Sequence, residues 1–199
     1  MALFSGQRIA ITKIEAARRQ LRTALELWFA DGDPVSIHTL AYAAYEVVHF
    51  VAKSKDPNTE LIFDWPGIKD EARGQWRKII AGDANFFKHA NRDPDDSIEF
   101  GPAHSKIFIM FSLMGLRSMK LPLTQIEEAF SSWLLFNHPE VLTAEGRKPY
   151  AKLFEDQAAI KEVRDLSRSE FLERFIQSRQ MNAAPPRGVV IGHIQLPKF

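Results

Sequence analysis

The chain lacks cysteine, and this absence excludes several classes of chemistry. With no Cys among 199 residues, the protein has no thiol nucleophile, no iron–sulfur cluster, no disulfide scaffold and no cysteine-ligated zinc finger. A chain of this length can bury enough apolar surface to fold without a disulfide or a structural metal. Because proteins of reducing compartments carry few disulfides, we predict a cytoplasmic location.

The sequence also lacks a strong charge of either sign and a long apolar run. Lys and Arg number 26 against 25 Asp and Glu, a net charge of +1. This balance argues against a strongly electrostatic binder of nucleic acid or membrane surfaces. The longest apolar run, IFIMFSLMGL at residues 107–116, is shorter than the roughly 20 residues that span a bilayer. It is typical of a buried core helix, so we expect no membrane partner.

Familiar catalytic motifs are missing as well. The sequence contains no G-x-x-x-x-G-K-[ST], G-x-G-x-x-G, G-x-S-x-G or H-E-x-x-H pattern, which are the common signatures of nucleotide-binding proteins, hydrolases and metalloproteases. No two carboxylates are spaced convincingly as an acid and base pair. These absences favour a non-catalytic protein over an enzyme, and we expect no cofactor.

What the sequence does contain is helical periodicity along most of its length. Apolar residues recur at three- and four-residue spacing. Asp33 followed by Pro34 is a typical helix start, and Ser167 with Glu170 fits a capping box. We predict an all-α, single-domain bundle of roughly six to eight helices over residues 1–181 and an irregular, proline-rich tail over 182–199. A short strand at 61–63 is considered. A break near Gly82 is considered in the predicted helix over 68–91, because glycine has a low helix propensity. The predicted helices span about 11–30, 34–53, 68–91, 103–119, 123–137, 145–154, 156–165 and 169–180.

The second predicted helix has two different faces and no charged one. On a helical wheel, four aromatic or hydrogen-bonding residues fall within about 60° of one another, and an aliphatic face lies opposite. Such a helix is usually buried on both sides. The four residues therefore either belong to the core or line a pocket or groove. They are His38, Tyr42, Tyr45 and His49.

A single metal ion held by both histidines of this face is excluded by geometry. His38 and His49 are eleven residues apart, and the helical rise separates them by about 16 Å. We therefore predict no metal site.

The third predicted helix carries a polar face near its end. Asn85, His89 and Arg92 share this face, and Lys88 lies beside them. Lys88 or Arg92 could bind an anionic group of a ligand. The alternative is a solvated helix end, where basic residues interact favourably with the helix dipole.

The segment Ala84–Ala90, ANFFKHA, resembles the signature helix of HEPN-type domains. The resemblance implies a small all-α bundle, often homodimeric, and many such domains are metal-independent ribonucleases of toxin–antitoxin and defence systems. Their motif is an Arg followed by a polar residue, with a His four to six positions beyond the Arg. Asn85 and His89 match it. Ala84 stands where the Arg is expected, and it cannot stabilise phosphoryl charge in a transition state.

Three functional hypotheses follow from these features. The first is a non-catalytic helical protein that binds a partner chain or a small ligand through His38, Tyr42, Tyr45, His49, Asn85, Lys88, His89 and Arg92. The second is a HEPN-like ribonuclease, the only hypothesis with a nucleic-acid partner, in which His89 is the general acid or base and Arg92 or Arg77 replaces the missing arginine. The third is a structural homodimer.

The segments SIHTLAYAAYEVVH and FFKHANRDPDD also resemble uncharacterised bacterial proteins. This resemblance supplies no function.

Overall fold

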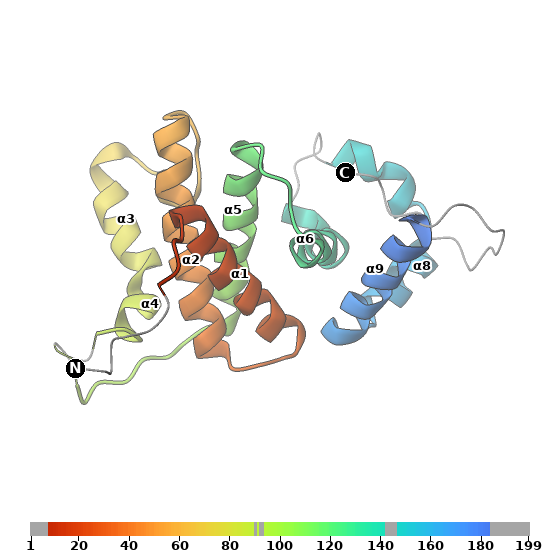
Figure 1. Cartoon of the computed structure of the whole chain (residues 1–199), viewed down its shortest axis with the longest axis horizontal. Helices are drawn as coiled ribbons and strands as arrows, with labels where there is room; N and C mark the ends of the chain where they lie inside the picture. Colours follow the sequence, from red (N-terminus) through yellow and green to blue (C-terminus); the bar gives the residue numbers. More distant parts are fainter. Residues whose placement is uncertain (1–7, 90, 92–93, 142–146, 184–199) are drawn as a thin grey trace. The chain divides into compact units, whose positions relative to one another are not determined.

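The computed structural model describes residues 8–89, 91, 94–141 and 147–183, and this part of the chain is all-α (Figure 1). It contains eight α-helices and no strand, so the predicted fold class and number of helices are confirmed. Within the described residues, no helix combines the length and apolar character needed to cross a membrane. The helices are α1 (Lys13–Phe29), α2 (Pro34–Lys55), α3 (Arg73–Ile80), α4 (Gly82–Phe86), α5 (Ser105–Ser118), α6 (Gln125–Asn137), α8 (Gln157–Arg164) and α9 (Arg168–Ala183).

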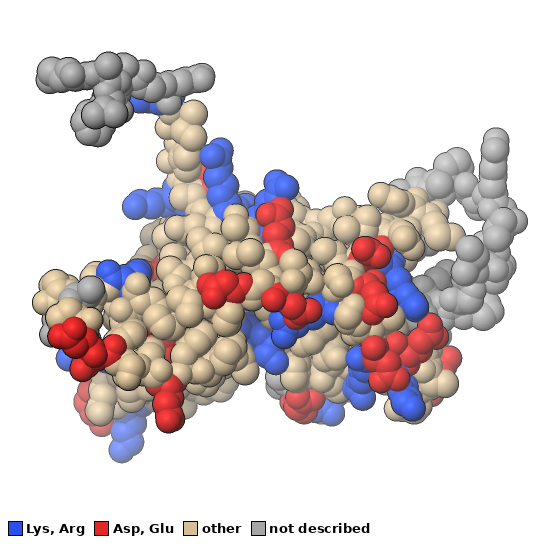
Figure 2. Space-filling model, turned by 90° about the horizontal axis from the view of Figure 1, so that it is seen from below, with Lys and Arg blue, Asp and Glu red and all other residues tan. Residues whose placement is uncertain are grey.

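The contacts divide the described chain into two compact units. Unit 1 comprises the described residues up to Ala24 together with Asp33–Pro122, and unit 2 comprises Leu25–Gly32 together with the described residues from Leu123 onward. On the face of the molecule seen in Figure 2, acidic and basic side chains are interspersed rather than gathered by sign, as the near-zero net charge suggests.

Unit 1 is built around the pair of α2 and α5, which lie side by side and run in the same direction (Figure 1). Asp33 caps α2 by accepting the Ser36 backbone N–H at 2.7 Å, and Pro34 is its first residue, as predicted. The two helices approach closely at Gly115 of α5, where an added Cβ would lie 2.5 Å from Cγ1 of Val48. The core around this contact is fully buried and includes Leu21, Tyr45, Val48, Ile109 and Leu116.

The segment between α2 and α3 differs from the sequence prediction. The strand considered at 61–63 is wrong, because Ile62–Asp64 form a 3₁₀ turn, η2. Leu61, Ile62 and Phe63 are buried, and a strand there would need a partner for its backbone groups, which the described residues do not supply. Trp76 of α3 fixes the turn by donating its indole N–H to the Ile62 carbonyl at 2.7 Å.

The predicted helix over 68–91 is three shorter elements instead. A 3₁₀ turn, η3 (Asp70–Ala72), leads into α3, and α4 follows after a break at Ala81. The break falls next to Gly82, where the low helix propensity of glycine favours an interruption. The described residues between α4 and the 3₁₀ turn η4 (Pro102–His104) form no helix, and η4 precedes α5.

Unit 2 packs aromatic residues from several elements. Trp28 contacts Phe130 and Trp133 of α6 at centroid distances of 4.9 and 4.5 Å, and the Arg168 guanidinium lies over the Trp28 ring. The predicted capping box of Ser167 and Glu170 is present. Further 3₁₀ turns are η5 (Pro139–Val141) and η6 (Lys148–Phe154), the second lying where a short helix was predicted. The predicted tail lies, from residue 184 onward, outside the described residues.

Candidate functional site

The four residues of the predicted ligand-binding face of α2 are buried in unit 1. His38, Tyr42, Tyr45 and His49, here called the tyrosine–histidine row, expose between 0% and 3% of their surface. Their side chains therefore pack inside the unit, in keeping with the core interpretation of this face. Any part they play in binding must be exerted through the residues that they contact.

His38 lies at one end of the row in an aromatic environment. Its Nδ1 is 3.2 Å from the hydroxyl of Ser105, and its ring makes edge-to-face contacts with Phe87, Phe100 and Phe108. Its Nε2 has no hydrogen-bond partner among the described residues. Burial lowers the pKa of His38, only partly opposed by the charge of Asp83, so the ring is neutral at neutral pH.

Lys88 is the point at which the second predicted cluster meets the row. Its ammonium lies 4.9 Å from the centre of the Tyr42 ring, a cation–π contact. Burial raises the pKa of Tyr42 to about 12, so this tyrosine carries no charge. Asn85 and His89 are exposed and one turn apart, with the His89 N–H donating to the Asn85 carbonyl at 3.1 Å. The remaining predicted residue, Arg92, lies outside the described residues.

At the other end of the row, Tyr45 and His49 form a chain of polar contacts. The Phe63 backbone N–H donates to the Tyr45 hydroxyl oxygen at 3.0 Å, and this oxygen is 3.5 Å from His49 Nδ1. His49 Nε2 lies 3.4 Å from Oδ2 of Asp64. Burial raises the pKa of Tyr45 and lowers that of His49, the latter opposed by Asp64. The arrangement is satisfied when Tyr45 donates its proton to Nδ1 and the Nε2–H of His49 faces Asp64.

The chain of contacts ends at Asp64, a buried carboxylate that the sequence prediction missed. Asp64 is 7% exposed. Its Oδ1 accepts a hydrogen bond from Arg77 at 3.1 Å and lies 3.8 Å from Arg73, and Oδ2 is 3.5 Å from the Lys53 ammonium. Oδ2 nevertheless has no partner with hydrogen-bond geometry among the described residues. Asp64 is thus a single carboxylate with three cationic side chains around it.

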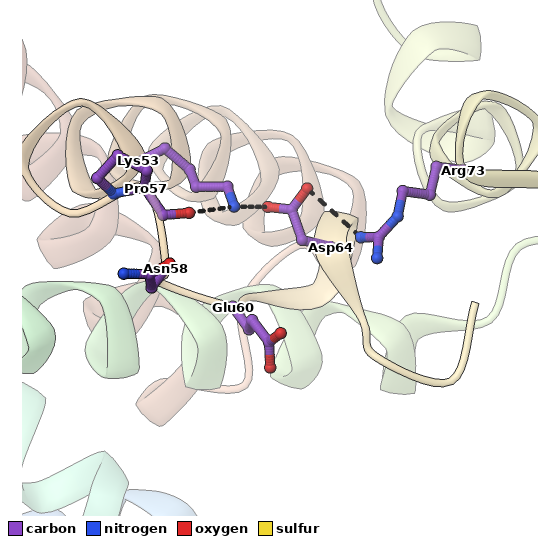
Figure 3. A pocket seen from close by; sticks show the side chains of 6 residues that line it. All are labelled: Lys53, Pro57, Asn58, Glu60, Asp64 and Arg73. Carbon is purple, nitrogen blue, oxygen red and sulfur yellow. Dashed lines mark hydrogen bonds and ion pairs between the residues drawn. The ribbon is translucent and has the colours of Figure 1, made fainter. Parts of the chain in front are cut away.

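Asp64 forms part of the wall of a surface pocket of about 340 Å³ (Figure 3). In the close-up view, its carboxylate lies between the ammonium of Lys53 and the guanidinium of Arg73. Lys53 is also fixed by donating to the Pro57 carbonyl at 2.9 Å, and Arg73 by donating to Asp70 at 2.6 Å. This pocket, here called the cationic pocket after Lys53 and Arg73, also has two acidic residues in its wall. It is lined by Lys53, Pro57, Asn58, Glu60, Asp64 and Arg73.

None of the seven described residues of the predicted binding set lines the cationic pocket. A signal for it was nevertheless present in the sequence. Asp64 is a lone acidic residue within the apolar stretch Leu61–Trp65, and an ionised side chain is rarely buried unless it is paired. The same stretch also suits a connection or a short strand, and no sequence spacing links it to Lys53, Arg73 or Arg77.

The described residues offer little to a metal ion. No three His, Asp or Glu side chains in this part of the chain lie close enough to hold one. The exposed pair of His104 and Asp83, 3.7 Å apart, is an ion pair of two residues only. The three cations around Asp64 would also repel a metal from that carboxylate.

Comparison with protein-family models, with curated proteins and with solved structures finds no match to this chain. The functional argument therefore rests on the geometry and charge of the cationic pocket.

Proposed function

We propose that the protein is a non-catalytic binding protein whose unit 1 binds a small anionic ligand in the cationic pocket. The observation that carries this proposal is the pair of cations on the pocket wall, Lys53 and Arg73, which with Arg77 surround the buried carboxylate of Asp64. Glu60, the other acidic residue of the lining, is exposed. The pocket volume of about 340 Å³ is at the lower end of the range for small-molecule sites. Its charged lining suits a small, polar ligand rather than an apolar one.

The residues around the pocket divide into ligand contacts and supports. Lys53 and Arg73 line the pocket, and their side chains are 31% and 29% exposed, so both can reach a ligand. Arg77 holds Asp64 by a hydrogen bond to Oδ1. His49 contacts Asp64 from the buried side, and Tyr45 contacts His49 in turn. In this proposal the tyrosine–histidine row positions the site and does not touch the ligand.

The test is titration calorimetry with inorganic phosphate and with small carboxylates, using the full chain and two charge-removing variants. Lys53→Met and Arg73→Met are each expected to weaken anion binding by tenfold or more, because each removes a cation from the pocket wall. Lys55→Met is the matched control, since Lys55 is an exposed lysine two residues along the same helix end and does not line the pocket. Absence of anion binding by the unaltered protein, or an equal loss in Lys55→Met, would contradict the proposal.

A metal-independent, HEPN-like ribonuclease is the alternative proposal. It is supported by the exposed position of Asn85 and His89, one turn apart at the end of α4. The position of the missing arginine is unfavourable, because Ala84 is fully buried and a longer side chain there would meet the core. Arg77, one of the two replacements considered, already bonds Asp64. RNA degradation by purified protein that His89→Ala abolishes would favour this alternative, and no degradation of any RNA class would remove it.

Location and assembly remain proposals of the same kind. The absence of cysteine supports a cytoplasmic location, and fractionation of cells that produce the protein would test it. A homodimer or a protein partner is compatible with the anion-binding role. Sedimentation of the full chain would test the homodimer, and a purely monomeric profile would count against it.

A further inference from the structure

We infer that acidity regulates the cationic pocket, which binds an oxyanion more tightly once His49 has taken up a proton. This inference rests on the proposed anion binding and deepens it by naming its regulation. The observation that carries it is geometric. One oxygen of Asp64 is shared by a lysine that lines the pocket and a histidine that is buried in the core.

The shared oxygen is Oδ2 of Asp64. Lys53 Nζ lies 3.5 Å from it (Figure 3), and His49 Nε2 lies 3.4 Å from it. Neither contact has hydrogen-bond geometry, so neither nitrogen holds the oxygen firmly. The Lys53 side chain is 31% exposed, whereas that of His49 is 1% exposed. A change in the charge of the histidine therefore acts on the partner of the lysine, although the histidine itself does not reach the pocket.

The contacts on the other side of the ring favour a neutral His49 at neutral pH. The Tyr45 hydroxyl oxygen accepts the Phe63 backbone N–H at 3.0 Å and lies 3.5 Å from His49 Nδ1. Its own proton is thus available to Nδ1. A proton taken up at Nδ1 turns this hydroxyl from a donor into an acceptor, which leaves its O–H without that partner. Protonation therefore requires a rise in acidity.

The charged groups that face His49 lie on three elements. Burial lowers the pKa of His49, Asp64 of η2 opposes this change, and Arg77 of α3 and Lys53 of α2 add to it. Arg73 of α3 acts through Asp64, from which it lies 3.8 Å away. Carboxylates, lysines and arginines ordinarily keep their charge between about pH 5.5 and pH 7.5, whereas histidine does not. His49 is therefore the member of this cluster that changes charge in that range.

Protonation of His49 favours a bound anion in two ways. It adds a positive charge directly behind the pocket wall, and that charge attracts the anion. It also makes His49 the stronger partner of Oδ2, because a charged donor bonds a carboxylate more strongly than a neutral one. Lys53 is then released from Asp64 and can donate to the ligand. By reciprocity, a bound anion raises the proton affinity of His49 by the same factor.

The experiment is titration calorimetry of the full chain with sulfate, at about pH 7.5 and about pH 5.5 and at constant ionic strength. Sulfate is the probe because its charge is the same at both values, whereas phosphate gains a proton between them. We expect sulfate to bind at least threefold more tightly at the lower pH, where circular dichroism verifies the fold. Equal or weaker binding at the lower pH overturns the inference and leaves the anion pocket standing. Absence of binding of sulfate, phosphate and carboxylates at both values overturns the inference and the proposed function together.

Two variants assign the effect to one histidine. His49→Gln keeps a polar side chain and cannot gain a charge, so the threefold gain should fall below 1.5-fold. His104→Gln is the matched control, because His104 is an exposed histidine of unit 1 that pairs with Asp83 and does not line the pocket. This control should keep the gain. Survival of the gain in His49→Gln, or its loss in His104→Gln, would overturn the inference.

A second measurement uses the unaltered protein and remains decisive if His49→Gln does not fold. Nuclear magnetic resonance follows the titration of the His49 ring in saturating sulfate and in sodium chloride of equal ionic strength. The proton affinity of His49 should be at least threefold higher in sulfate, as reciprocity requires. An identical titration of His49 in the two salts, with sulfate bound, would overturn the inference.

Discussion

Asp64 illustrates how one buried charge organises its surroundings. A carboxylate that is removed from water loses hydration free energy, and it is tolerated only when opposite charges and hydrogen bonds replace that loss. Arg77 supplies the hydrogen bond, and Lys53, Arg73 and the Nε2–H side of His49 supply the nearby positive or donor groups. These partners lie on two helices, α2 and α3, so they become neighbours only in the folded chain.

Removal of this charge should destabilise unit 1. Asp64→Asn leaves Arg77 without its anionic partner, and we expect the free energy of unfolding to fall by about 2–4 kcal/mol. The control is Asp70→Asn, because Asp70 also pairs with Arg73 but its side chain is 91% exposed, and exposed pairs contribute little. Urea denaturation measures both variants. A similar loss in the two would show that burial of Asp64 is not the cause.

The two histidines of the row predict a pH dependence of stability. Burial lowers the pKa of both His38 and His49 below the ordinary value of 6.5. In the unfolded chain these residues bind protons at a higher pH than in the folded protein, so stability is fully present above pH 6.5 and is lost as the pH falls through the folded pKa values. Charges of Asp83 and His104 act on His38, and those of Asp64, Arg77 and Lys53 on His49.

The measurement is the free energy of unfolding at intervals from about pH 7 to pH 5.5, a range above the ordinary pKa of Asp and Glu. We expect a steady fall in the unaltered protein and a smaller fall in His38→Gln, whatever the stability of that variant at pH 7. His89→Gln serves as the control, because His89 is exposed. An unchanged slope in His38→Gln would contradict the assignment of the pH dependence to this histidine.

At the scale of elements, the contact between α2 and α5 depends on the absence of a side chain at residue 115. A Cβ there would lie 2.5 Å from Cγ1 of Val48 and 3.1 Å from Leu61. Both distances are too short for a closely packed core to absorb without movement of the helices. Leu61 immediately precedes η2, so this contact also helps to place Asp64.

Gly115→Ala is therefore expected to destabilise the protein by about 1–3 kcal/mol through overpacking. The matched control is Gly74→Ala in α3, where an added Cβ meets no atom within 4 Å. The control should raise stability by up to about 1 kcal/mol, since alanine has the higher helix propensity. Thermal unfolding followed by circular dichroism compares the two. Equal effects of the same sign would contradict the packing argument.

The sequence predicted elements well where local signals decide them. Asp33 with Pro34 and Ser167 with Glu170 marked two helix starts correctly, because a cap is a short-range interaction. The stretch around Leu61–Phe63 was predicted less well, since apolar residues suit a strand and a buried turn equally. The break considered near Gly82 is present at Ala81, because the low helix propensity of glycine is also a local signal.

The candidate site was predicted least well, for a reason that is also physical. Helical spacing correctly grouped His38, Tyr42, Tyr45 and His49 on one side of α2, but it carries no information on whether that side meets solvent. Lys53, Asp64 and Arg73 share no periodicity, since they lie on a helix end, a 3₁₀ turn and the start of another helix. Their proximity depends on how the connection from α2 to α3 folds back, which no short motif encodes.

At the scale of the whole molecule, the division into two units predicts which unit a bound ligand stabilises. A ligand that binds only the folded state stabilises it by mass action, by about 2.7 kcal/mol at a concentration one hundred times its dissociation constant. The cationic pocket lies wholly within unit 1. We therefore expect phosphate to slow amide hydrogen exchange in α2, η2 and α3, and to leave α6, α8 and α9 of unit 2 unchanged.

Hydrogen exchange followed by mass spectrometry measures this difference. Sodium chloride at equal ionic strength is the control, and it should slow exchange in neither unit beyond its general effect as a salt. Equal slowing by phosphate in both units would mean that they open as one cooperative body, and it would contradict the expectation that the units respond separately.

The close approach at Gly115 has a consequence for how this sequence can drift over generations. Every amino acid other than glycine carries a Cβ, so any substitution at residue 115 places a Cβ too close to Val48. Substitution there becomes tolerable only after residue 48 has become smaller. In descendants of this chain, residues 48 and 115 should therefore vary together, with glycine retained wherever valine remains.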